Sequence, residues 1–153
     1  MVLVPGLALY LGWPATTIEA IAMAAAVLAT AGFLIVGALY WRGVDRRLKG
    51  LGKGSLISAL AFADRAERPL LALIAPAAAA TAASILADGF TSASIAAMAL
   101  TALAALEYVN YYRRQLQYFD NFADLKRLLT TGRLKRAHMA RGLEDYRSRK
   151  GRA

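Results

Sequence analysis

Residues 20–41 read AIAMAAAVLATAGFLIVGALYW, a run without one charged side chain. A helix rises about 1.5 Å per residue, so about 20 such residues cross a hydrocarbon core of about 30 Å. The run ends in Tyr40, Trp41 and Arg42, two aromatic rings suited to headgroup depth followed by a cation. The sequence therefore predicts a transmembrane helix over 17–41, with these three residues as membrane-interface anchors.

The start of this helix is marked by Thr16 and Glu19, which have the Ser/Thr-x-x-Glu spacing of a capping box. In that motif a hydroxyl and a carboxylate satisfy the free N–H groups of the first turn. Residues 1–16 are apolar but broken by Pro5, Gly6, Gly12 and Pro14. We expect them to form an apolar N-terminal arm that is interfacial or loosely helical.

Two further uncharged runs follow. The first predicts a second transmembrane helix over 70–88, because Pro69 suits a first turn and the kink expected at Pro76 is tolerated in membranes. A tight turn follows, with Thr91 or Ser92 as the next helix cap. The third predicted span is 92–112, whose exit carries the anchors Tyr108, Tyr112 and Arg113.

Composition supports an all-α membrane protein. The chain is 58% hydrophobic, whereas a soluble domain has about 45 to 50% apolar residues. A soluble alanine-rich bundle is the alternative, but 153 residues would then have to bury residues 20–41 on all sides.

The connection over 42–69 is predicted to be a basic cytoplasmic loop. Its first part, 42–54, combines Arg and Lys with four glycines and reads as flexible. The segment from Ser55 to about Arg68 is amphipathic, which predicts a short interfacial helix on the membrane surface between the first and second spans.

Charge placement predicts the orientation. All 19 Lys and Arg residues, which give a formal net charge of +9, fall in the segments 42–69 and 113–153. By the positive-inside rule the N-terminus is outside and residues 113–153 form a basic, amphipathic cytoplasmic tail, as in a bacterial-type inner membrane. Helices are expected over 115–131 and from Arg133 to about Arg147. Clustered cations attract anionic lipid headgroups, and nucleic acid is a weaker alternative because no binding motif accompanies the charge.

Continuing the third helix beyond the membrane puts polar residues on one face. This predicted polar interaction face comprises Glu107, Asn110, Tyr111, Arg114, Tyr118 and Asn121. We expect Glu107, an ionisable group inside a span, to bond to Tyr111 or to pair with an Arg of 42–54. The same stretch is also typical of a plain membrane exit, with an aromatic belt and cations that extend to the headgroups.

Small residues recur every fourth position in the spans, which lets helix backbones approach closely within one chain or between copies. These rows are Ala22, Ala26 and Thr30; Ala75, Ala79, Ala83 and Ala87; and Ala93, Ala97, Thr101 and Ala105.

Catalytic patterns are sparse. Cysteine is absent, and His138 is the one histidine, which we read as a polar surface residue of the tail. Asp120 and Asp124 could hold a divalent cation with Glu144 or Asp145, but acids that offset a basic tail are the simpler interpretation. There is no P-loop, dinucleotide fingerprint or CxxC motif, so we expect no metal, no cofactor and no enzymatic activity.

The sequence thus favours a non-enzymatic scaffold or accessory subunit that docks a membrane-protein partner or another copy through residues 107–131 and the tail. A pore-forming oligomer is the alternative. The predicted topology resembles that of one class of phage holins, although no motif supports the likeness and the 42–69 loop and the tail depart from the compact holin pattern. A membrane enzyme or transporter that uses Glu107 and Asn110 is the third alternative, ranked after the scaffold and the pore.

Overall fold

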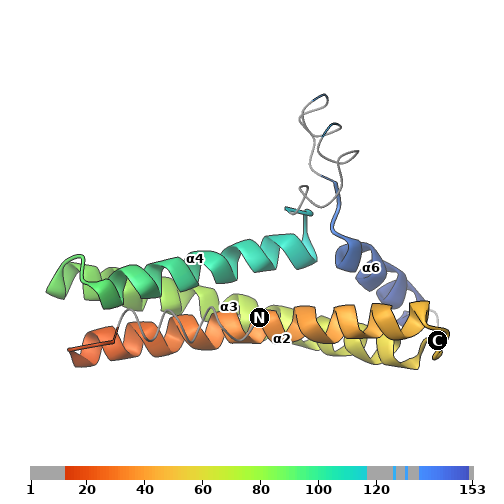
Figure 1. The fold of residues 1–153 in the computed structure, drawn as a ribbon, viewed down its shortest axis with the longest axis horizontal. Coiled ribbons are helices and arrows are strands. Elements are labelled where there is room, and N and C mark those ends of the chain that lie inside the picture. The colour runs from red at the N-terminus through yellow and green to blue at the C-terminus, as the bar shows by residue number, and fades with distance from the viewer. Residues whose placement is uncertain (1–12, 117–125, 127–129, 131–134, 152–153) are drawn as a thin grey trace. The chain divides into compact units, whose positions relative to one another are not determined.

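The computed structural model describes residues 13–116, 126, 130 and 135–151. These residues form four helices, shown in Figure 1: α2 (Thr17–Leu48), α3 (Gly54–Asp88), α4 (Ser92–Tyr112) and α6 (His138–Lys150). By length and composition, α2, α3 and α4 are each able to cross a membrane. The predicted all-α class with three apolar spans is confirmed to that extent. The expectations for residues 1–12 lie outside the described residues.

The connection between the first two spans differs from the prediction. Helix α2 continues through Arg42 to Leu48, and α3 begins at Gly54 and continues through Pro69 and Pro76. The chain turns at Gly50 and Gly52, whose φ angles of 74° and 84° favour glycine. A separate interfacial helix is not shown, because residues 55–68 are the first part of α3.

The described residues divide into two compact units. The apolar unit holds the residues up to Val36 together with Ala66–Glu107, and the basic unit holds Gly37–Arg65 together with the residues from Tyr108 onward. Every Lys and Arg of the sequence except Arg68 falls in the ranges of the basic unit. Helix α2 thus carries most of its uncharged run in the apolar unit and its three arginines in the basic unit.

Small side chains build the core of the apolar unit. Ala22, Met23 and Ala26 of α2 form one buried cluster with Ala93, Ala97 and Leu100 of α4. The Thr30 hydroxyl donates to the Leu100 carbonyl oxygen at 2.8 Å. Close approach of two helices at alanine explains this packing, because no large side chain holds the backbones apart. The predicted small-residue rows of α2 and α4 therefore lie at an interface within the chain.

One end of the apolar unit is held by polar caps. The Glu19 amide donates to the Thr16 hydroxyl at 3.3 Å, and the Thr16 amide donates to Glu19 Oε2 at 3.2 Å, so the predicted capping box is confirmed. The Thr91 hydroxyl accepts the Ser94 amide at 3.1 Å and caps α4. It also donates to Glu19 Oε1, although Glu19 belongs to α2. The same carboxylate therefore links the first turns of two helices.

The basic unit brings α6 against α3. Met139, Ala140 and Leu143 are the buried residues of α6, and Ala59, Leu60 and Ala63 of α3 are buried as well. A Cβ atom at Gly142 would lie 3.3 Å from a methyl group of Leu60. The missing side chain at Gly142 therefore allows the two helices to come close.

Candidate functional site

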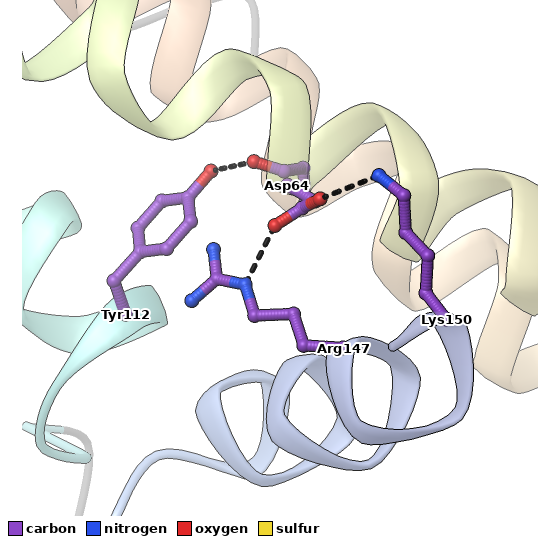
Figure 2. A network of polar contacts seen from close by, with 5 residues as sticks. Asp64, Tyr112, Arg147 and Lys150 are labelled. Carbon is purple, nitrogen blue, oxygen red and sulfur yellow. Dashed lines mark hydrogen bonds and ion pairs between the residues drawn. The ribbon is translucent and has the colours of Figure 1, made fainter. Parts of the chain in front are cut away.

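The C-terminal end of α6 is held by one carboxylate of α3. Asp64 Oδ1 accepts a hydrogen bond from Arg147 Nε at 2.6 Å, and its Oδ2 lies 3.8 Å from Lys150 Nζ. Figure 2 shows both cations reaching from α6 to this carboxylate. The Asp64 side chain is only 18% exposed, so the ion pairs are less screened than pairs on an open surface. Asp64 thus fixes α6 to α3.

The C-terminal end of α4 meets the same part of α3. The Tyr112 hydroxyl donates to the carbonyl oxygen of Ala63 at 2.9 Å, beside Asp64 in Figure 2. Tyr112 is buried, and its ring stacks on Tyr108 with the ring centres 5.5 Å apart. The Tyr108 hydroxyl in turn accepts hydrogen bonds from the guanidinium group of Arg113. These three predicted anchors therefore form one connected chain of contacts.

The first residue of α6, His138, is held by aromatic residues of α2. Its Nδ1 atom is hydrogen-bonded to the Tyr40 hydroxyl, and its ring stacks on Trp41 at 6.3 Å with 21° between the planes. Burial lowers the pKa of His138, and the charges of Arg141, Lys135 and Arg47 lower it further. A neutral imidazole can accept the Tyr40 proton at Nδ1. His138 is exposed, as the sequence suggested, but it also attaches α6 to α2.

A cavity of about 460 Å³ lies between α6 and the adjoining turns of α2 and α3. Its lining holds four cations, Arg47, Lys53, Arg141 and Arg149, against one acid, Asp145. Within the described part of the chain, no salt bridge joins any of these four cations to an acidic side chain. The remaining lining is aromatic and apolar: Tyr40, His138, Tyr146, Leu56, Ile57, Leu60 and Gly142. The lining of this cavity therefore has a clear excess of positive charge.

The predicted continuation of the third helix into the tail is wrong over residues 113–116. Helix α4 ends at Tyr112, and Arg114 forms an isolated antiparallel bridge with Arg136. The Asn110 side chain competes for the backbone there, because its oxygen accepts the Leu116 amide at 2.9 Å. The Gln115 amide also bonds to the Lys135 carbonyl oxygen, so α6 starts only at His138 rather than near Arg133.

The residues of the predicted polar face therefore have different surroundings. Asn110 and Tyr111 line a second cavity, of about 250 Å³, together with Tyr40 and Trp41. Tyr111 is buried, and its hydroxyl oxygen lies 2.2 Å from the position that a Cβ atom at Gly37 of α2 would take. Tyr118 and Asn121 lie outside the described residues.

Glu107 carries a buried polar atom near the end of α4. Its Oε2 atom is buried, and the structure gives it no hydrogen-bond partner among the described residues. The bond to Tyr111 and the pairing with an arginine of 42–54 stay predictions.

Sequence reasoning missed Asp64, His138 and the cations of the large cavity as members of one site. The signal for Asp64 was an acid in a segment that lies in the same chain as a strongly basic tail, with which it could pair. Among the described residues no group of three His, Cys, Asp or Glu side chains could hold a metal ion. Asp120 and Asp124 of the considered cation site lie outside those residues. Arg42, the third anchor of the first span, lies beside a shallow hollow formed with Ser55, Ser58 and Phe62.

No protein-family model matches this chain, and neither a curated protein nor a solved structure matches it. The chemistry of the site is therefore argued from its own residues.

Proposed function

We propose that this chain is a small integral membrane protein that acts as a non-enzymatic scaffold or accessory subunit. In this proposal its N-terminus is outside, its basic unit is cytoplasmic in a bacterial-type inner membrane, and the basic unit docks a membrane-protein partner or a second copy. Positive-inside charge placement supports the orientation. Helix α2 has 32 residues, about 48 Å, so it is longer than a hydrocarbon core of about 30 Å requires.

The observation that carries the proposal is the attachment of α6 to the membrane helices. Asp64 holds Arg147 and Lys150, and Tyr40 holds His138, so both ends of α6 are fixed. A fixed helix presents its exposed cations in a set arrangement, which lowers the entropy cost of binding a partner. A loosely attached tail would lose that conformational entropy each time it bound a partner.

Co-purification tests the proposal. The protein would be crosslinked in native membranes and recovered after mild detergent, with a stable partner or a second copy expected. Asp64→Asn removes the charge that holds α6, so we expect it to reduce recovery of that partner. Asp45→Asn is the matched control, because it removes one acid from the exposed Lys49–Asp45 pair without touching α6. Equal recovery from both variants, or no specific partner from the wild-type chain, would contradict the proposal.

A pore-forming oligomer is a second candidate because one small-residue row has no partner within the apolar unit. Ala75, Ala79, Ala83 and Ala87 of α3 are all exposed, whereas the rows of α2 and α4 are used inside the chain. An exposed row of this kind suits a helix from another copy. Induced expression that arrests growth and collapses the membrane potential would favour this function over the scaffold.

A further inference from the structure

We propose that the 460 Å³ cavity of the basic unit binds the phosphate group of one anionic phospholipid, with the start of an acyl chain on its apolar wall. The inference rests on the proposed function in one respect, namely that the basic unit lies at the cytoplasmic headgroup level. It goes further by assigning a ligand and a defined site.

The first argument is the uncompensated charge. Arg47, Lys53, Arg141 and Arg149 come from α2, the following turn and α6, and they surround one hollow with only Asp145 as an acid. Like charges around a cleft with low-dielectric walls repel one another and raise the local concentration of anions. A phosphate that accepts hydrogen bonds from guanidinium groups relieves that repulsion.

The second argument is that two helices begin at this cavity. Lys53 directly precedes α3, and His138 is the first residue of α6. The cap residue of α6, Ala137, makes no side-chain hydrogen bond to the free amides of the first turn. Helix N-termini carry a partial positive charge and unpaired N–H groups, which favour a phosphate in the same place as the four cations.

The third argument distinguishes a lipid from a free anion. Leu56, Ile57 and Leu60 of α3 form an apolar wall of the same cavity, and the Ile57 side chain is 50% exposed. Inorganic phosphate has no apolar groups that could pack against that wall, whereas a phospholipid places glycerol and methylene groups beside its phosphate. The volume also lies within the range of about 300 to 1,000 Å³ that is usual for ligand sites. Tyr40 lines the cavity and is also predicted to lie at the level of the lipid headgroups. The cavity is therefore expected at that level.

Native mass spectrometry of the full chain released from defined membranes tests the inference. With phosphatidylglycerol we expect one retained lipid per chain, and with phosphatidylcholine much less. In Arg47→Gln/Arg141→Gln the retained phosphatidylglycerol should fall by about tenfold or more, since each cation near a surface contributes to anionic lipid binding. The matched control is Arg65→Gln/Arg68→Gln, which removes the same charge from exposed arginines of α3 outside the cavity lining and should change retention little.

Equal loss in the two double variants, or equal retention of the two lipids, would overturn the inference. Binding of glycerol phosphate with no retained phospholipid would overturn its lipid part and leave an anion site. If the cavity variant does not fold, photoreactive phosphatidylglycerol on the wild-type chain gives the answer. Crosslinks should map to peptides that contain Leu56–Leu60 or Arg141–Arg149, and crosslinks elsewhere contradict the site. Lack of a bound lipid alongside an intact co-purified partner would refute this inference and leave the proposed function standing.

Discussion

At the scale of single residues, the Thr91 hydroxyl makes two stabilising hydrogen bonds in the apolar unit. Its hydroxyl accepts the Ser94 amide at 3.1 Å and donates to Glu19, which caps the neighbouring helix α2. Thr91→Ala removes both contacts, and we expect it to cost about 1 kcal/mol or more of unfolding free energy. Ser92→Ala is the control, because Ser92 is exposed and does not cap α4; its effect should be within about 0.5 kcal/mol. Denaturation in mixed detergent micelles compares the two, and equal costs would remove Thr91 as the cap.

His138 gives the molecule a pH dependence. Because burial and the charges of Arg141, Lys135 and Arg47 lower its pKa below the ordinary 6.5, the docked α6 favours the neutral imidazole. The stabilisation that His138 gives to the docked α6 is therefore fully present above pH 6.5. It declines as the pH falls from 6.5 through the lowered pKa. A protonated ring can no longer accept the Tyr40 proton at Nδ1.

Trp41 reports this change, since its ring stacks on His138. In a Trp13→Phe background, which leaves Trp41 as the one tryptophan, the fluorescence of Trp41 should change between pH 7 and pH 5. His138→Gln should abolish the change. An identical pH profile in the two proteins would show that another group titrates.

At the scale of elements, α2 and α4 pack through alanines, and volume at those positions decides stability. Ala97 is fully buried in the α2–α4 cluster, whereas Ala79 of α3 is exposed. Ala97→Leu overfills the interface and should cost about 1 to 3 kcal/mol. Ala79→Leu makes the same chemical change on an open face, and within one chain it should cost less than about 0.5 kcal/mol. The two substitutions can be compared by detergent denaturation, and a larger cost at Ala79 would point to an interface with another copy.

The sequence was sufficient for the elements whose signals are local. The uncharged run 20–41 predicted a span, and Thr16 with Glu19 predicted the start of α2, because hydropathy and caps act over a few residues. The C-terminal end of α2 was harder to predict from the sequence. Gly43 lies inside the helix instead of in a flexible connection, and a Cβ atom there would meet the Leu56 backbone at 2.8 Å, so its role is close packing against α3.

The end of α4 depends on partners far along the chain. Nothing between Leu106 and Leu116 breaks a helix by propensity, yet Gln115 pairs with Lys135 and Arg114 with Arg136. Such pairing is not visible in periodicity. The candidate site is nonlocal for the same reason: Asp64 and Arg147 are 83 positions apart, and Tyr40 and His138 are 98 apart. Composition predicted a basic tail, but not that the tail folds back onto the helices.

At the scale of the whole molecule, the apolar and basic parts of the chain separate into two units. Arg68 is the one cation of the apolar unit's ranges, whereas the ranges of the basic unit hold the other 18 Lys and Arg residues against six acids: Asp45, Asp64, Asp120, Asp124, Glu144 and Asp145. Such a partition fits a protein with one part in lipid and the other in water beside anionic headgroups. It also explains why the proposed partner site and lipid site fall in the same unit.

Labelling of single cysteines tests the proposed three-span orientation most directly, because the natural chain contains no cysteine. Leu51→Cys, Ser92→Cys and Ser148→Cys place thiols at exposed positions in the α2–α3 turn, at the start of α4 and in α6. In intact spheroplasts an impermeant maleimide should label Ser92→Cys alone, and membrane disruption should expose the other two. Labelling of all three in intact spheroplasts, or of Leu51→Cys or Ser148→Cys instead of Ser92→Cys, would contradict three crossings with a cytoplasmic basic unit.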